Sequence, residues 1–122
     1  MKIRIKGNTV RYRLTKSDIA TLVDTGNLED KTEFIGSTLV YSIKTAVDES
    51  LSADFLNNTI TLNVPSELLT NWADTSQVSL ESNMPLDNGS QLYLLLEKDF
   101  KCIDGDASED QSDFFENPNL NC

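Results

Sequence analysis

NTVRYRLTKSDIATLVDTGNLE (residues 8–29) and NTITLNVPSELLTNWADTSQVS (residues 58–79) align without a gap, and this match decides the expected fold. The identical pairs are Asn8 with Asn58, Thr9 with Thr59, Asp24 with Asp74 and Thr25 with Thr75. The apolar pairs are Val10 with Ile60, Tyr12 with Leu62, Leu14 with Val64, Ile19 with Leu69, Leu22 with Trp72 and Leu28 with Val78. After three extra residues in the second half, GSTL (36–39) continues onto GSQL (89–92). The agreement in order and periodicity predicts a duplicated unit of about fifty residues.

Each half of the chain reads as strand, strand, helix, strand, strand. Apolar and polar residues alternate through 2–14 as in a half-buried hairpin, and Thr15 with Asp18 caps a helix that stops at Gly26. The other expected elements are strands at 27–34, 37–44, 51–56 and 59–64, a short helix from Pro65, and strands near 77–84 and 91–98. The residues expected to face the core are Ile19, Leu22 and Val23 in the first helix and Leu68, Leu69 and Trp72 in the second.

Eight strands and two helices predict an α+β domain dominated by antiparallel pairing. We expect a pseudo-twofold sheet curled into a barrel or half-barrel, since closure hides the sheet edges that invite aggregation. An open sheet and a closed barrel both fit the sequence. The prediction is a single domain over residues 1–101, built from repeats 1–48 and 49–101. An acidic, cysteine-containing tail at 102–122 is expected to pack on that domain.

The formal net charge of −10 over 122 residues argues against nucleic acid and anionic membranes as partners, because both carry negative charge. Histidine is absent, which removes the usual proton shuttle and the commonest zinc ligand. The N-terminus offers no continuous apolar segment, so no secretory signal is predicted and a cytoplasmic location is the expectation. Cys102 and Cys122 would be free thiols there and could form a disulfide in an oxidising compartment.

The basic residues are concentrated at the start of the chain. Six of the ten lie in the first sixteen positions, with no acid among them: Lys2, Arg4, Lys6, Arg11, Arg13 and Lys16. Four of these alternate with core residues and therefore share one face of the first hairpin: Arg4, Lys6, Arg11 and Arg13. Their counterparts in the second half are Asp54, Leu56, Thr61 and Asn63. Like charges across a hairpin require an anionic ligand, a partner or the protein's own acids, and we favour the last.

The C-terminal tail is one source of such acids. Residues 104–116 hold six carboxylates and no basic residue, together with Phe114 and Phe115. Exposed ion pairs contribute at most about 1 kcal/mol each, whereas ordering one residue costs about 1–2 kcal/mol. We therefore expect the aromatic residues to anchor the tail and the acids to set its register.

Other chemistry finds less support in the sequence. The tail has oxygen ligands for calcium or magnesium without the EF-hand spacing, so a solvated acidic linker is favoured. Nucleophile and phosphate-loop motifs are absent. Glu33, Glu81 and Glu97 together with the basic hairpin resemble barrels that hold triphosphate and magnesium. Those enzymes open with an E-x-E-x-K strand, whereas this chain has KIRIK at 2–6, so the acids that would hold the metal are not at that strand.

Both ends of the chain resemble a bacterial family of about this length that has no assigned function. The stretches that carry the resemblance are KIRIKGNTVRYRL (2–14), EKDFKC (97–102) and EDQSDFFENPN (109–119). The resemblance covers nearly the whole chain and implies a free-standing cytoplasmic protein. In that family a basic or histidine residue often follows the cysteine and Pro-Asn-Pro closes the tail, whereas this chain has IDG (103–105) and ENP (116–118). No site that needs that basic residue is expected here, and no activity is implied.

The sequence thus predicts a protein of unknown function that acts as a small non-catalytic binding or interaction module. The alternative is a phosphate- or nucleotide-handling enzyme that grips an anion with the basic hairpin. The candidate ligand-binding residues are Arg4, Lys6, Arg11, Arg13, Cys102, Asp110, Asp113, Phe114 and Asn117. No catalytic residue, metal ligand or cofactor is predicted, and a protein or a small anionic ligand is the expected kind of partner.

Overall fold

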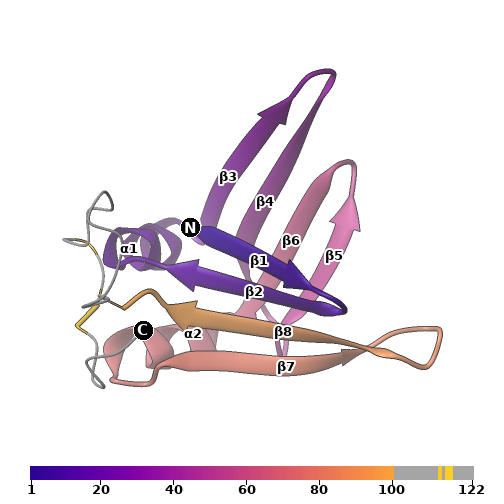
Figure 1. Cartoon of the computed structure of the whole chain (residues 1–122). Coiled ribbons are helices and arrows are strands. Elements are labelled where there is room, and N and C mark those ends of the chain that lie inside the picture. The colour runs from indigo at the N-terminus through magenta and orange to yellow at the C-terminus, as the bar shows by residue number, and fades with distance from the viewer. Residues whose placement is uncertain (101–112, 114, 117–122) are drawn as a thin grey trace.

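The computed structural model describes residues 1–100, 113, 115 and 116, and within them the chain forms eight strands and two helices (Figure 1). The first half contains β1 (Lys2–Lys6), β2 (Thr9–Leu14), α1 (Lys16–Thr25), β3 (Asn27–Phe34) and β4 (Ser37–Ala46). The second half contains β5 (Ser52–Leu56), β6 (Thr59–Pro65), α2 (Ser66–Asp74), β7 (Ser79–Pro85) and β8 (Gln91–Lys98). The predicted α+β class and the predicted order of elements are confirmed.

The strands form two four-stranded sheets, and each sheet takes one hairpin from each half of the chain. Sheet A has the order β1-β2-β8-β7, and sheet B has the order β3-β4-β6-β5. The hairpins are antiparallel, and they meet through a central parallel pair, β2 with β8 in sheet A and β4 with β6 in sheet B. Replacing each strand by its counterpart in the other half converts one order into the other. The pairing plan therefore repeats with the sequence.

The register of the central pairs repeats too. Val10 pairs with Leu94 in sheet A, and Ile60 pairs with Tyr41 in sheet B. Val10 and Ile60 are counterparts in the sequence match, and so are Leu94 and Tyr41 once the three extra residues of the second half are counted. The alignment drawn from the sequence therefore describes real positions in the two sheets.

One pair in that alignment is wrong. Leu80 pairs with Leu96 on β8 in the way that Leu28 pairs with Ile43 on β4. Leu80 is consequently the counterpart of Leu28, and Val78 lies outside β7 with 42% of its surface exposed. The extra residues fall mainly between α2 and β7, where the second half needs a longer connection.

Antiparallel pairing dominates as predicted, with four of the six described strand pairs, but the predicted curling of a single sheet into a barrel is wrong. Among the described residues there are two separate sheets, both mixed, and neither closes. The physical reason is the helix between the two hairpins of each half, which is about 15 Å long for the ten residues of α1 and about 14 Å long for the nine residues of α2. It carries the chain away from the first hairpin, so the second hairpin joins the other sheet. Closure is replaced by two open sheets with edges at β1, β7, β3 and β5.

Helix α1 begins and ends as its sequence indicates. The Thr15 hydroxyl accepts a hydrogen bond from the Asp18 amide (3.3 Å), the Asp18 carboxylate accepts one from the Thr15 amide (3.0 Å), and Gly26 ends α1 at φ 75°. None of the described helices is long and apolar enough to cross a membrane. The capping box and the glycine stop were both predictable because their causes are local.

The buried apolar residues form one cluster to which both halves contribute. Its fully buried members include Tyr12 and Leu22 from the first half and Leu62, Trp72 and Leu96 from the second. Val23 and Leu68, which were expected to face this core, are 47% and 38% exposed. Each short helix presents only a narrow stripe to the core, with Ile19 and Leu22 on α1 and Leu69 and Trp72 on α2.

Candidate functional site

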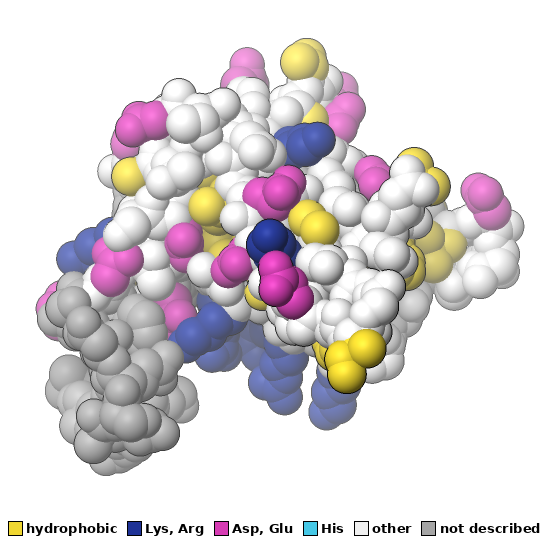
Figure 2. Space-filling model, turned by 90° about the horizontal axis from the view of Figure 1, so that it is seen from above, with side chains coloured by type: hydrophobic (Ala, Val, Ile, Leu, Met, Phe, Trp, Pro, Cys, Tyr) yellow, Lys and Arg dark blue, Asp and Glu magenta, His cyan; other side chains and the backbone are white. Residues whose placement is uncertain are grey.

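The outer face of sheet A carries five basic side chains from two neighbouring strands. We call this surface the basic face: Lys2, Arg4 and Lys6 on β1 and Arg11 and Arg13 on β2. The alternate residues of the same strands point to the core, and Tyr12 and Leu14 among them are fully buried. Dark-blue side chains project together along the lower margin in Figure 2, whereas magenta acidic side chains are spread over the surface turned to the viewer. The basic face is thus built by strand alternation.

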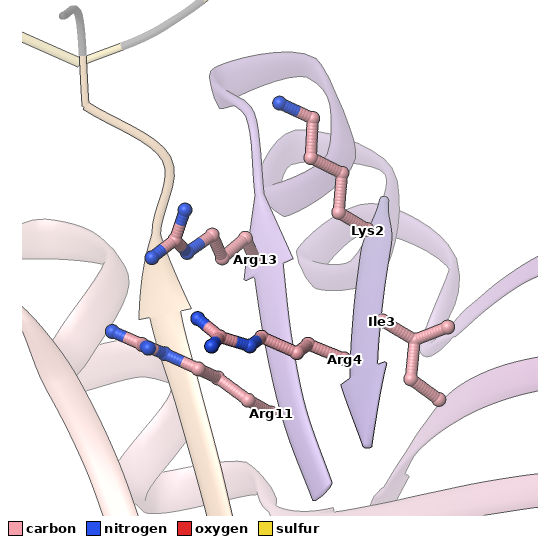
Figure 3. A pocket seen from close by; sticks show the side chains of 5 residues that line it. All are labelled: Lys2, Ile3, Arg4, Arg11 and Arg13. Atoms are coloured by element: carbon pink, nitrogen blue, oxygen red, sulfur yellow. The ribbon is translucent and has the colours of Figure 1, made fainter. Parts of the chain in front are cut away.

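The register of β1 and β2 brings like charges directly opposite each other. Lys2 is opposite Arg13, and Arg4 is opposite Arg11. Figure 3 shows Arg4, Arg11 and Arg13 extending to the same side of the hairpin, whereas Ile3 points the other way. Opposed like charges destabilise a strand pair unless an anion lies close by. The hairpin alone would therefore be electrostatically strained.

Glu97 on β8 supplies one such anion from the protein itself. The parallel pairing of β2 with β8 places Arg13 opposite Glu97. Glu97 Oε1 accepts hydrogen bonds from Nε of Arg11 and from Nε of Arg13, both at 2.7 Å, and Oε2 lies 3.4 Å from Nη2 of Arg11. The Glu97 side chain is 12% exposed, whereas those of Arg11 and Arg13 are 32% and 41% exposed, so the contact is only partly shielded from water. One carboxylate thus forms ion pairs with two of the three arginines.

Arg4 and Lys6 are in a different position. Both are exposed, and neither forms an ion pair with any residue in the part of the chain that the structure describes. Lys2, at the other end of β1, lies 3.3 Å from Oδ2 of the nearly buried Asp99. The surface between these side chains is hollowed into two shallow depressions. One, of about 340 Å³, is lined by Lys2, Ile3, Arg4, Arg11 and Arg13, and the other, of about 240 Å³, by Arg4, Lys6, Thr9 and Arg11.

The same outer face carries a second acid at its other end, on β7, and this acid also has a hydrogen-bond donor. The hydroxyl of Tyr93 on β8 donates a hydrogen bond to Oε2 of Glu81 on β7 (2.5 Å). This hydrogen bond raises the pKa of Tyr93, because it favours the protonated phenol beside a carboxylate. The sequence indicated a role for Glu81 and Glu97 only in the enzymatic alternative. Both in fact serve as acceptors for donors of sheet A.

The described part of the C-terminal segment binds at α1. Asp113 receives three hydrogen bonds there: its carbonyl oxygen from the Lys16 amide (3.1 Å), its Oδ1 from the Ser17 amide (3.2 Å) and its Oδ2 from the Ser17 hydroxyl (2.5 Å). The Ser17 hydroxyl, followed by the Thr15 side chain, lowers the pKa of Asp113. Asp113 therefore completes the N-terminal cap of α1, where free amide groups favour a negative charge.

Phe115 provides a second contact of that segment. Its amide donates to the Asp99 carbonyl (2.7 Å), and its ring meets the Phe100 ring edge-on with centroids 6.0 Å apart. The ammonium groups of Lys98 and Lys16 lie 5.4 Å and 5.8 Å from its centroid. Backbone pairing, ring contact and two cations thus hold this aromatic residue.

Lys98 is a structural residue that the sequence did not single out. It is 6% exposed, its ammonium donates to the Thr75 carbonyl at the end of α2 (2.7 Å), and it lies 5.7 Å from the Trp72 ring. Burial lowers the pKa of Lys98. Its position in the alternation, after Leu94 and Leu96, was the signal that it points inward.

The structure brings some of the predicted site residues together and places others apart. Arg4, Lys6, Arg11 and Arg13 share the basic face, whereas Asp113 accepts hydrogen bonds from the first turn of α1. The remaining predicted residues, Cys102, Asp110, Phe114 and Asn117, lie outside the described residues. Among the described residues, Glu97 on β8 and Asp99 therefore form ion pairs with the basic hairpin.

Comparison with known proteins gives a family but no activity. The sequence model of a family described as "Family of unknown function (DUF7009)" matches residues 1–119. A search of curated proteins and a search of solved structures each found no match. The resemblance to a family without assigned function that the two ends of the chain indicated is confirmed.

Proposed function

The chain belongs to a family of unknown function, and from that premise we propose that it is a small non-catalytic binding module. Its working surface would be the basic face of sheet A, and its ligand would be an anionic group, either free or carried by a partner protein. The cytoplasmic location expected from the sequence is part of this proposal.

The observation that carries the proposal is the excess of positive charge on one face of an acidic protein. The net charge is −10, yet the basic face has five cations, and two of its arginines share a single carboxylate, Glu97. Arg4 and Lys6 extend beyond that contact without an ion-pair partner among the described residues. An anion placed beside them would relieve the repulsion between Arg4 and Arg11.

The form of the face supports binding over catalysis. The enzymatic alternative supposed a barrel that encloses a triphosphate and its metal, and the described sheets remain open. Phosphoryl transfer depends on a water-excluded site and on carboxylates that are available to hold magnesium. Glu97 is held by two arginines and Glu81 by Tyr93, so the acids of this face already have donors.

The proposal is tested by measuring anion binding to the full chain and to matched variants. We expect tripolyphosphate to bind and its affinity to fall steeply with salt, as an electrostatic contact requires. The pair Arg4→Gln with Lys6→Gln should weaken it about tenfold, because each exposed cation contributes up to about 1 kcal/mol. Lys31→Gln with Lys44→Gln on sheet B makes the same change in net charge and should leave the affinity nearly unchanged.

Two results would contradict the proposal. Equal losses in both pairs of variants would mean that only the total charge of the protein matters. Release of phosphate from tripolyphosphate or from a nucleotide in the presence of magnesium would instead favour the enzyme. The second assay uses the same protein and needs only a phosphate determination over time.

A further inference from the structure

Strand β1 forms one edge of sheet A. It is the terminal strand of the order β1-β2-β8-β7, with β2 on one side only (Figure 1). In the described part of the chain, no backbone hydrogen bond outside the β1–β2 hairpin involves residues 3–6. An edge strand of this kind presents a row of amide and carbonyl groups that another extended chain can pair with.

The side chains of β1 alternate in a way that would select such a chain. Arg4 and Lys6 lie on the outer face, and Ile5 between them lies on the inner face with 58% of its surface exposed. Ile3 is partly buried against the core, and Lys2 contacts Asp99, so the Arg4–Lys6 end is the more accessible part of the edge. A paired strand would place its own alternate side chains beside these residues on the same two faces.

The other three edges of the described sheets carry a different pattern. β3 contains Glu29, Asp30 and Glu33, β5 contains Asp54, and β7 contains Glu81. β1 is the edge that has bases and no acid. A second β1 strand would bring Lys and Arg against Lys and Arg and is disfavoured. An acidic strand would instead meet opposite charge.

We infer that β1 is a strand-addition site for an extended acidic peptide. The peptide would pair its backbone with β1 and present the triplet acid–apolar–acid opposite Arg4, Ile5 and Lys6. The two acids would face the guanidinium and the ammonium on the outer face, and the apolar residue would cover Ile5 on the inner face. This inference rests on the proposed function, and it names the partner class as a protein segment and the mode as β-strand addition.

The test compares three ligands on the full-length protein. The first is tripolyphosphate, the second is a short blocked peptide in which Glu and Val alternate, and the third is that peptide with N-methyl groups on alternate residues. N-methylation removes the backbone donors and keeps all the charge. We expect it to weaken binding at least about fivefold, since each lost hydrogen bond to an otherwise unpaired group lowers affinity. Hydrogen exchange should show new protection of β1 amides with the unmethylated peptide.

Two variants sharpen the assignment to Ile5 and to the edge. Ile5→Thr keeps the β-branched shape favoured in strands. It should lower the affinity for the Glu-Val peptide more than the affinity for a Glu-Ser peptide, which has no apolar residue for Ile5 to contact. Phe55→Thr on β5, the counterpart edge of sheet B, removes an apolar residue that is 69% exposed, compared with 58% for Ile5, and should change the affinity for neither peptide. If the basic face recognised charge alone, neither substitution would change the affinity for either peptide. That result would overturn strand addition.

The outcomes separate this inference from the proposed function. Equal affinity of the methylated and unmethylated peptides, together with binding of tripolyphosphate, overturns strand addition and leaves the anion-binding face. Failure of all three ligands overturns both. Concentration-dependent self-association that Arg4→Gln with Lys6→Gln abolishes would show that a second copy, through its acidic β3, is the occupant, and would overturn the assignment to a separate peptide.

Discussion

Sheet A and sheet B have the same plan of strands and different outer faces. The inner positions match in kind: Leu96 and Ile43 are counterparts at the centres of the two sheets, and both are fully buried. The outer positions diverge, since the paired Arg4 and Arg11 of sheet A correspond to the paired Asp54 and Thr61 of sheet B. The fold therefore requires the inner residues, and sheet B shows that it does not require the basic ones.

The central parallel pair shows the same divergence at one position. Arg13 lies opposite Glu97 in sheet A, and its counterpart Asn63 lies opposite Lys44 in sheet B. At this equivalent position β8 thus carries an acid and β4 carries a base. Glu97 occurs where two arginines must be neutralised, so its role is tied to the basic face and not to the shared plan of strands.

The largest expected effect is on the shared core. Leu96→Ala and Ile43→Ala each remove a fully buried side chain at equivalent positions and should each lower the free energy of unfolding by about 2–5 kcal/mol. Urea unfolding followed by circular dichroism measures both. Similar losses in a single transition are expected, because one cluster of buried residues includes both positions. Two separate transitions would contradict a common core.

A smaller effect is expected from Glu97→Gln. The substitution leaves Arg11 and Arg13 without their shared carboxylate, and we expect a loss of about 1–2 kcal/mol, reduced from the value for a buried pair because both arginines are partly exposed. Higher salt should reduce the loss, since it screens the repulsion between the arginines. Lys44→Gln at the equivalent position of sheet B should cost less than about 0.5 kcal/mol. Equal losses in the two variants would remove the distinction between the faces.

The sequence predicted what depends on neighbouring residues. Thr15 and Asp18 form the capping box, Gly26 ends α1, and strand alternation places Arg11 and Arg13 on one face, because each of these features has a local cause. The sequence match also placed Val10 and Ile60 at equivalent positions of the two sheets. Those regularities fixed the elements and the composition of the basic face.

The choice of neighbours could not be predicted in the same way. Alternation says which face a residue occupies and not which strand lies beside it, so two open sheets and a barrel have the same periodicity. Glu97 is more than eighty residues from Arg11 and Arg13 in the chain, and it meets them only through the parallel pairing of β2 with β8. Alternation after Leu94 and Leu96 indicates that Lys98 points inward, but it does not indicate that the Thr75 carbonyl and the Trp72 ring lie beside its ammonium group.

The two helices differ at their N-termini, and pH is the means to test that difference. The first turn of α1 is capped by Thr15 and Asp113, whereas α2 begins after Pro65 without a side-chain cap. The pKa of Asp113 is lowered in the folded protein, so its contribution to stability is present above the ordinary pKa of 3.8 and is lost as the pH falls through the lowered value.

We therefore expect Asp113→Asn to lower the urea midpoint at neutral pH. The midpoints of the variant and the wild type should converge as the pH falls below the lowered pKa of Asp113. Asp87→Asn, in the loop between β7 and β8, should follow the wild type at every pH. A constant gap between Asp113→Asn and the wild type down to acid pH would show that the carboxylate charge has no part in the cap.

The smallest effect is a change in titration with little change in stability. Tyr93 is held by Glu81, which raises the pKa of the phenol, and Arg11 opposes that shift with its positive charge. Glu81→Gln should therefore bring the pKa of Tyr93 down towards its ordinary value, and alkaline titration of tyrosinate absorbance would record the change. Glu29 is the counterpart of Glu81 on β3, as their partners Ser42 on β4 and Leu95 on β8 show, so Glu29→Gln removes the same charge and should leave the Tyr93 transition where it was. If the two variants shifted that transition equally, the cause would be the total charge of the protein, and the local difference between the outer faces would be lost at this position.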